Sequence, residues 1–330
     1  MYELSQRFGR RAGALLLALA LCGGARAGAA EVTERMLVPV GHTVGIKLFS
    51  RGVVVVKLTE GGSPAKSCGL KTGDVILECG GTAVTSTEQF QSLLQEAEGA
   101  TELAVRREGD TVTLSVAPKA NDQGVNCIGA WVRDSMAGIG TMTYYDPETG
   151  EFGALGHGIT DVDTNLLMPF SNGSILPSTV KAVKKGAAGS AGELRGDFDL
   201  TTDLGGLTAN TAAGVFGRLE DPDYAAGDAI PVGTAVAGKA VIRSNVEGDE
   251  TEEYDIEILK TTENAADGRD LVICVKDEDL LSRTGGIVQG MSGSPIIQNG
   301  KLVGAVTHVL LNDPTKGYGI SMETMLSAAG

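Results

Sequence analysis

Short runs of valine, isoleucine and threonine, separated by glycine, are the feature that most limits the folds open to this chain. Glycine accounts for 47 of the 330 residues, and long amphipathic helical patterns are scarce. Because glycine adopts the positive φ angles that tight turns need, the pattern predicts many short strands joined by tight turns. The length suits about two domains, so we expect a mainly β protein built from two units.

The composition excludes several classes of function. Hydrophobic residues make up 42% of the chain and charged residues 21%, which is typical of packed globular domains. The net charge of −15, without a basic stripe, argues against nucleic acid as a partner. The cysteines show neither CxxC spacing nor pairing with histidine, so we predict no metal and no other cofactor. Both disulfides and free thiols remain open for the five cysteines: Cys22, Cys68, Cys79, Cys127 and Cys274.

Residues 1–30 are predicted to be a signal peptide or an N-terminal anchor. Three arginines precede an apolar run, Ala12 to Cys22, and Ala25-Arg26-Ala27 follows as a small-x-small cleavage pattern. The run is short for a membrane span, which needs roughly 20 apolar residues. We therefore expect the chain to be exported, so that the residues after the leader work outside the cytoplasm.

Residues 35–118 are predicted to form a first unit of mixed α and β structure. Ser63 is placed to cap a short helical turn that has Pro64 at its first position. The apolar residues of Ser86 to Ala97 have helical spacing. Two strand patterns then flank Glu108-Gly109-Asp110, which indicates a β-hairpin.

This order of elements, centred on SPAKSCGLKTGDVILECGG, resembles the PDZ domains of exported bacterial proteases. Such domains capture a peptide C-terminus in a loop of backbone N–H groups, and the peptide adds a strand to the sheet edge. Val44, Gly45 and Ile46 resemble that carboxylate-binding loop, so the resemblance implies a peptide C-terminus or an extended segment as partner. A degenerate PDZ domain that only packs against its neighbour is the alternative.

Residues 119–126 are predicted to be a linker, and residues 127–330 a second unit. This unit is rich in short β-like runs and in turns of glycine, aspartate and asparagine, which indicates a β-barrel or a sandwich. Ser321 to Ala329 is a modest helical pattern at the end of the chain.

Gly290-Met291-Ser292-Gly293-Ser294-Pro295 is the sharpest local motif of the chain. Glycines on both sides suit a tight turn that exposes a serine hydroxyl and leaves backbone N–H groups free to face an oxyanion. The motif resembles the nucleophile segment of trypsin-like peptidases, which implies a double β-barrel. It favours Ser292 over Ser294 as nucleophile and implies an oxyanion hole formed by the N–H groups of Gly290 and Ser292. Met291 replaces an aspartate that often pairs with a new N-terminus, so activation by that route is not expected.

A serine nucleophile needs a base, and the chain has three histidines. His157 lies between glycines and precedes Ser292 by a long span, in the His…Asp…Ser order of chymotrypsin-like enzymes. His42 lies in the PDZ-like unit, while His308 and Thr307 follow the nucleophile at the position of a cleft-lining strand. Periodicity leaves the carboxylate open among several aspartates: Asp161, Asp163, Asp197, Asp199, Asp203, Asp277 and Asp279.

The segments GALGHGITD, VKDEDLL and GGIVQGMSGSPIIQNGKLVGAVTHVLLNDPTKGYGI, with the PDZ-like unit before them, resemble the SpoIVB peptidase family of endospore-forming bacteria. The resemblance implies catalytic roles for His157, Asp277 and Ser292. It also implies secretion into the space between the two forespore membranes. There the peptidase would cut itself near its N-terminus and cleave a membrane-bound regulator of an intramembrane protease. A late mother-cell sigma factor would be activated as a result.

Two other interpretations remain at this stage. The first is a non-catalytic PDZ adaptor with an inactive peptidase-like domain, although the presence of all three triad residue types in order argues against it. The second is an exported quality-control protease similar to the Deg/Htr group. That group carries its PDZ domain after the protease domain, whereas here the PDZ-like unit comes first.

Overall fold

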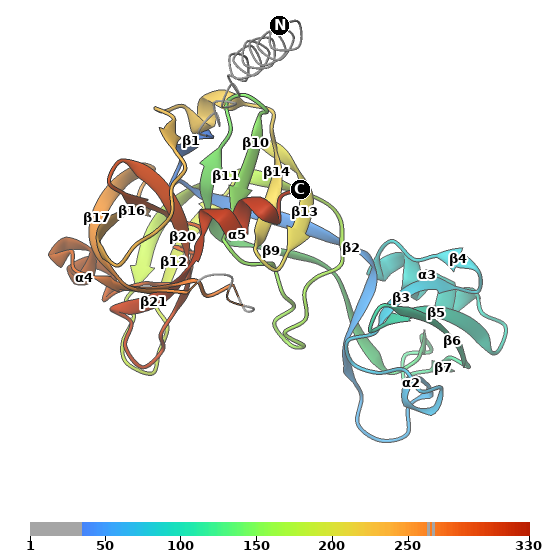
Figure 1. The fold of residues 1–330 in the computed structure, drawn as a ribbon. Coiled ribbons are helices and arrows are strands. Elements are labelled where there is room, and N and C mark those ends of the chain that lie inside the picture. Colours follow the sequence, from blue (N-terminus) through green and yellow to red (C-terminus); the bar gives the residue numbers. More distant parts are fainter. Residues whose placement is uncertain (1–34, 263–264, 266–267) are drawn as a thin grey trace, which may run out of the picture. The chain divides into compact units, whose positions relative to one another are not determined.

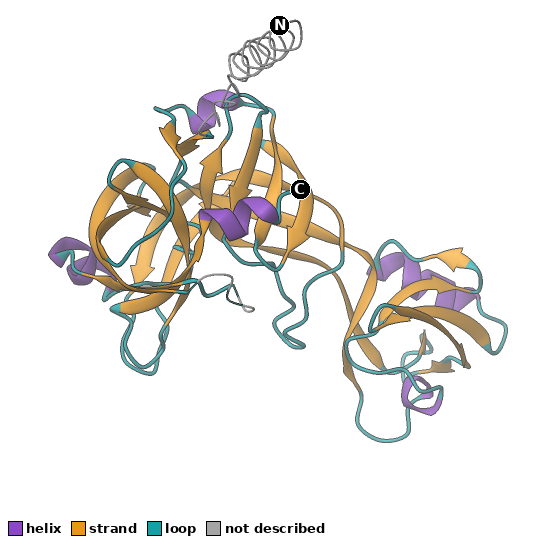
Figure 2. Ribbon diagram, in the orientation of Figure 1, coloured by secondary structure: helices purple, strands orange, loops and turns teal. Residues whose placement is uncertain are grey.

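The computed structural model describes residues 35–262, 265 and 268–330, so the predicted leader at residues 1–30 lies outside the described residues. Strands dominate the described part of the chain, and the helices are few and short (Figure 2). This confirms the prediction of a mainly β protein. None of the described helices is long and apolar enough to cross a bilayer. The four cysteines among the described residues are free thiols: Cys68, Cys79, Cys127 and Cys274.

The first barrel is part of a thirteen-stranded sheet. Its antiparallel pairings run in the order β9–β10–β14–β13–β11–β2 and return from β2 to β9, so this part of the sheet closes on itself. Its interior is a cluster of apolar side chains that includes Ile46, Phe152 and Val215. The six strands are β2 (Thr43–Leu58), β9 (Ala130–Tyr145), β10 (Glu151–Ala154), β11 (Phe170–Lys184), β13 (Gly205–Thr211) and β14 (Gly214–Leu219).

The second barrel is closed and contains six strands, coloured orange to red in Figure 1. Its core holds Ile242, Ile273 and Val306, which are fully buried. The strands, in barrel order, are β16 (Gly238–Glu247), β17 (Glu250–Thr261), β18 (Leu271–Val275), β21 (Lys316–Ser321), β20 (Lys301–Val309) and β19 (Pro295–Gln298).

The PDZ unit is inserted between β2 and β9, two neighbouring strands of the first barrel. Its apolar core includes Phe90, Leu94 and Leu103. As predicted, the Ser63 side chain caps the first helix and a hairpin turns at Glu108 and Gly109. The predicted second helix spans Thr87–Glu96, and the Ser86 side chain caps it. Besides the second half of β2, the unit contains α2 (Pro64–Ser67), β3 (Val75–Cys79), β4 (Thr82–Ala83), α3 (Thr87–Glu96), β5 (Thr101–Arg107) and β6 (Asp110–Val116).

The insertion corrects two sequence predictions, namely the start of the PDZ unit at residue 35 and the carboxylate-binding loop at residues 44–46. Residues 43–49 do not belong to the PDZ unit, because this half of β2 pairs with β11 on one side and with β9 on the other. Val44, Gly45 and Ile46 therefore form a barrel strand and not a carboxylate-binding loop. Val44 and Ile46 are buried in the barrel core, and a Cβ atom on Gly45 would lie 2.7 Å from the Phe198 side chain.

The remaining elements lie along the barrels or, in the case of β7 and β8, beside α3 of the PDZ unit. They are β1 (Met36–Pro39), β7 (Lys119–Ala120), β8 (Asn126–Cys127), β12 (Glu193–Phe198), a 3₁₀ turn η1 (Pro222–Ala225), β15 (Ile230–Pro231), α4 (Glu278–Thr284) and α5 (Met322–Ser327). β7 and β8 pair with each other across the predicted linker. α5 confirms the helical pattern at the end of the chain, whereas α4 was not predicted.

Candidate active site

Ser292 lies in a tight turn that leads into β19. Its neighbours Gly290 and Gly293 both have a φ of 99°, in the region that favours glycine. A Cβ atom on Gly293 would lie 2.6 Å from the backbone nitrogen of Leu155, so glycine alone permits this close approach to the segment before His157. The Ser292 hydroxyl is partly exposed and donates a hydrogen bond to the Thr307 carbonyl oxygen at 2.7 Å.

The structure distinguishes the two serines of the motif. Ser294 is fully buried, and its hydroxyl donates to the Ser244 hydroxyl of β16 at 3.0 Å. Ser292 is instead partly exposed and lines a pocket that His157 also lines. This placement agrees with the prediction of Ser292 as nucleophile and gives Ser294 a role inside the second barrel.

The backbone around Ser292 suits an oxyanion hole. Within the described residues, the N–H groups of Gly290 and Ser292 donate to no other backbone or side-chain acceptor. The Gln289 carbonyl oxygen accepts a hydrogen bond from the Leu194 N–H of β12 at 2.8 Å, which fixes the peptide that contains the Gly290 N–H. Met291 is fully buried in the core of the second barrel. Neither predicted donor is therefore taken up by another acceptor among the described residues, which an oxyanion hole requires.

His157 directly follows the strand β10 and its short turn. Its Nδ1 atom lies 2.9 Å from the Gly158 carbonyl oxygen. With the proton on Nδ1, this bond leaves Nε2 free to accept a proton. Burial lowers the pKa of the imidazole below its ordinary value, and the hydrogen bond with Gly158 opposes part of that shift. The ring is therefore neutral near pH 7, which is the form a general base needs.

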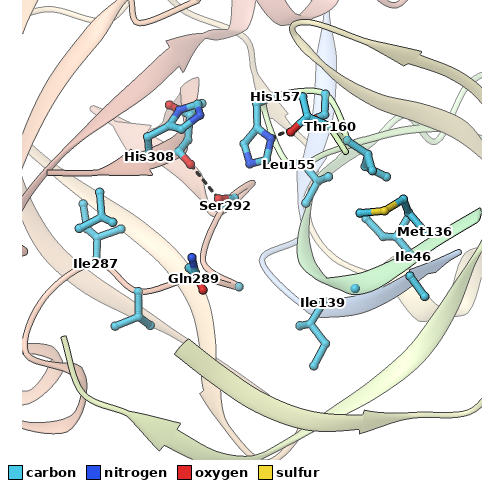
Figure 3. Close-up of a pocket in the computed structure, with 18 residues that line it drawn as sticks. Ile46, Met136, Ile139, Leu155, His157, Thr160, Ile287, Gln289, Ser292 and His308 are labelled. Carbon is cyan, nitrogen blue, oxygen red and sulfur yellow. Dashed lines mark hydrogen bonds between the residues drawn. The ribbon is translucent and has the colours of Figure 1, made fainter. Parts of the chain in front are cut away.

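His157 and Ser292 line the same pocket, which has a volume of about 390 Å³ (Figure 3). Segments of both barrels form its walls, so the pocket lies between them. Apolar side chains from both sides face it, and no aspartate, glutamate, lysine or arginine is among the described residues that line it. The labelled apolar side chains are Ile46, Met136, Ile139, Leu155 and Ile287.

Thr307 and His308, which the sequence places in the cleft, line this pocket too. The pairing of β20 with β21 shifts register between Val306 and His308, so Thr307 lies at an irregularity of the ladder. The rings of His308 and His157 are 5.0 Å apart between centroids and tilted by 38°. His308 is therefore a neighbour of the proposed base and is exposed to the cleft.

Asn210 of β13 holds the segment after His157, a contact that sequence analysis missed. Its Oδ1 accepts from the Ile159 N–H at 2.8 Å, and its Nδ2 donates to the carbonyl oxygens of Ile159 and Met168 at 3.0 Å. The side chain is buried. The signal in the sequence was a single asparagine within the strand Gly205–Thr211. A side-chain amide that is buried in a strand needs several hydrogen-bond partners, so Asn210 was a candidate for holding a neighbouring loop.

The loop beyond Ile159 connects the site to the PDZ unit. Its Asp161 carboxylate is fully buried and forms an ion pair with Arg133 of β9. The same carboxylate accepts from the Thr164 N–H at 2.9 Å and the Thr164 hydroxyl at 3.0 Å. Met168 packs against Val54 and Val75 in one apolar cluster. His157 is thus followed by a loop whose position depends on the inserted unit.

The structure does not bring Asp277 to the pocket. Its carboxylate caps α4, accepting from the Leu280 N–H at 2.9 Å. Capping by aspartate stabilises a helix start because the first N–H groups have no partner within the helix. Asp279 pairs with Arg283 at 2.8 Å, so it does not supply the carboxylate either. The catalytic role of Asp277 stays a prediction, and in this structure the Gly158 carbonyl is the group that faces Nδ1 of His157.

Comparison with known protein families shows the family to which the chain belongs. The family model described as SpoIVB peptidase S55 matches residues 124–326, and a PDZ domain model matches residues 55–107. The chain belongs to the SpoIVB peptidase S55 family. The S55 match contains both His157 and Ser292, whereas the barrel half of β2 precedes it. The protein is accordingly a serine endopeptidase with a PDZ domain inserted in its first barrel.

Individual proteins are similar to parts of the chain. Serine protease HTRA1 from Xenopus tropicalis is 35% identical over 57 residues, which is 17% of this chain and 12% of the relative. The PDZ domain of an SdrC-like protein from Listeria monocytogenes is 20% identical with a TM-score of 0.23, covering 25% of this chain and 87% of that one. The active form of the Rv3671c protease from M. tuberculosis is 14% identical with a TM-score of 0.32, covering 59% and 75%.

Proposed function

We propose that this S55 peptidase is exported during sporulation, cuts itself near its N-terminus and cleaves a membrane-bound regulator of an intramembrane protease. Its place of work is then the space between the two forespore membranes, and its output is activation of a late mother-cell sigma factor. Membership of the S55 family supports this proposal. The observation that carries the chemistry is that His157 and Ser292 line one pocket within the matched segment.

The chemistry begins with rotation of the Ser292 hydroxyl away from the Thr307 carbonyl. Nε2 of His157 takes the hydroxyl proton as Oγ attacks the carbonyl carbon of the scissile bond. The oxyanion of the tetrahedral intermediate is held by the N–H groups of Gly290 and Ser292. His157 returns the proton to the departing amine, which leaves an acyl-enzyme ester. A water molecule, activated by the same imidazole, then hydrolyses the ester and restores the Ser292 hydroxyl.

The walls of the pocket indicate the substrate class. Ile46, Ile139 and Ile287 face the cavity, and no charged side chain is among its described lining residues. An ionised substrate side chain buried there would have no partner of opposite charge, and its burial would cost several kcal/mol. We therefore expect cleavage of extended protein segments that carry an apolar side chain next to the scissile bond. The match to a PDZ domain supports a protein or peptide as partner.

The test is incubation of residues 31–330 with the membrane-embedded regulator and with peptides that differ at one side chain. Cleavage of the regulator and of a leucine-containing peptide is expected, with at least about a tenfold lower kcat/KM for the aspartate analogue. The Ser292→Ala variant is the matched control. Cleavage of peptides without cleavage of the regulator would reject the signalling role while leaving the peptidase assignment intact.

A non-catalytic adaptor is the alternative that the sequence left open. Membership of a peptidase family, together with an accessible serine and a neutral imidazole in one pocket, argues against it. The adaptor interpretation would be restored if the protein reacted with no serine-directed phosphonate, either alone or with a PDZ ligand present.

A further inference from the structure

Thr141 of β9 contacts the nucleophile turn from the other barrel. It is fully buried, and its hydroxyl donates to the Gly290 carbonyl oxygen at 2.7 Å. Its backbone N–H donates to the Ser292 carbonyl oxygen at 2.9 Å. Two hydrogen bonds from one residue therefore hold the turn on both sides of Met291.

The same residue also reaches the segment that carries the base. The Thr141 carbonyl oxygen accepts from the Leu155 N–H at 3.1 Å, two residues before His157. Thr141 thus touches both halves of the site with its three polar groups. Any rotation of its backbone would displace the Ser292 turn and the His157 segment together.

The turn needs such a hold because glycine has little conformational preference of its own. Gly290 has a φ of 99°, and several other backbone arrangements are open to a glycine in a short turn. Its own carbonyl is held by the Thr141 hydroxyl, and the Gln289 carbonyl before it is held by the Leu194 N–H. These two bonds fix the peptides on either side of the Gly290 Cα atom. If the Gly290 carbonyl were released, the ψ angle of Gly290 would be free to change, and with it the path of the turn from the Gly290 N–H to the Ser292 N–H.

We propose that Thr141 is a positioning residue of this peptidase, whose hydroxyl holds the oxyanion turn in its competent conformation. The inference rests on the proposed use of Ser292 as nucleophile. It assigns to the first barrel a part in oxyanion stabilisation, in addition to supplying His157. Because the bond is made to a backbone carbonyl, it acts on the geometry of the turn and not on the substrate.

The strand offers a matched control for the hydroxyl. Thr143 lies two residues further along β9 and is equally buried, but its hydroxyl has no hydrogen-bond partner within the described residues. Valine has the shape of threonine without the hydroxyl. Thr141→Val and Thr143→Val therefore make the same chemical change in the same strand, and they differ in whether a bond to the turn is lost.

The experiment measures the rate of fluorophosphonate labelling of Ser292 and the values of kcat and KM on an apolar peptide. Thr141→Val is expected to lower the labelling rate and kcat roughly 10- to 100-fold, with KM changed less than about threefold. Thr141→Ser, which keeps the hydroxyl, is expected to restore kcat to within about threefold of the wild type. Thr143→Val is expected to leave labelling and kcat unchanged.

Equal kcat values for Thr141→Val and Thr143→Val would overturn the proposal. So would equal losses in Thr141→Val and Thr141→Ser, because the hydroxyl would then not be responsible. Should Thr141→Val not fold, Thr141→Cys takes its place, since its weak S–H donor predicts a kcat between the serine and valine values. If the unmutated protein is not labelled, the assignment of Ser292 as nucleophile is refuted. If Thr141→Val is labelled as fast as the unmutated protein, only the role of Thr141 is refuted.

Discussion

The turn that carries Ser292 and the segment that carries His157 are built in different ways. The Ser292 turn combines bonds between neighbours in the chain, such as Met291 to Val288, with two bonds from Thr141 of β9. The His157 segment is held by distant residues, among them Asn210 of β13. The nucleophile turn therefore has bonds of its own besides its support from the first barrel, whereas the position of the base depends on long-range contacts that extend to the PDZ unit.

The largest expected effect separates the two serines of the turn. Ser292→Ala is expected to abolish phosphonate labelling and to lower peptide hydrolysis by at least about 10⁴-fold, because the Ser294 hydroxyl is buried and bonded to Ser244 and cannot replace the nucleophile. Ser294→Ala is expected to keep the labelling and to lower the free energy of unfolding by about 1 kcal/mol, through loss of the bond to Ser244. Gel-based labelling and chemical denaturation measure the two. Labelling that is lost in Ser294→Ala and kept in Ser292→Ala would reverse the assignment.

The next effect tests the long-range support of the base. Asn210→Ala is expected to lower kcat roughly 10- to 100-fold, because Ile159 and Met168 lose the amide that holds the segment after His157. The free energy of unfolding should fall by about 2 kcal/mol, since buried backbone groups lose their partners. Asn172→Ala, at an exposed position, is the control. An Asn210→Ala enzyme with wild-type kcat would show that the segment needs no support from β13.

The pH dependence tests the electrostatics at His157. Burial lowers the pKa of its imidazole, so the neutral base persists as the pH falls through 6.5 and is lost only at lower pH. The acid limb of kcat/KM is therefore expected below pH 6.5. His308→Gln is expected to keep that limb, which would assign it to His157. An acid limb above pH 6.5 would contradict the structure, because it requires a negative charge beside the imidazole.

The smallest effect concerns Asp277. Asp277→Ala is expected to lower the free energy of unfolding by about 1 kcal/mol, because α4 loses its cap, whereas Asp277→Asn keeps a capping oxygen and is expected near wild-type stability. Both variants should keep kcat within about tenfold of the wild type if the Gly158 carbonyl orients the imidazole. A loss of about 10⁴-fold in Asp277→Asn would instead place the carboxylate at His157 in the working enzyme.

Local signals made much of the fold predictable. Ser63 with Pro64, Ser86 before its helix, and Glu108-Gly109 each specify an element through contacts within a few residues, and all three are found as predicted. The glycines around Ser292 belong to the same kind of signal. Gly290 and Gly293 both have a φ of 99°, a conformation that glycine adopts readily and other residues rarely adopt.

Features that depend on distant partners were not predictable. β2 is one strand from Thr43 to Leu58, and its polar interruption, Ser50-Arg51-Gly52, suits a bend between two strands of one unit as well as a passage from the barrel into the PDZ unit. Asp277 precedes Glu-Asp-Leu-Leu, a pattern that suits a helix cap as well as a catalytic acid at a strand end. Asn210 and Thr141 act on backbone groups far away in the sequence, and such pairings leave no local trace.

The insertion of the PDZ unit has a consequence for processing of the chain. The unit is joined to the barrel at both ends, by β2 and by β9, and these strands pair with each other along most of their length. A single cut between residues 59 and 129 would leave each fragment with its own strand in the barrel. The fragments would stay together, so one cut inside the PDZ unit would not release it from the barrel, and its removal would need two cuts.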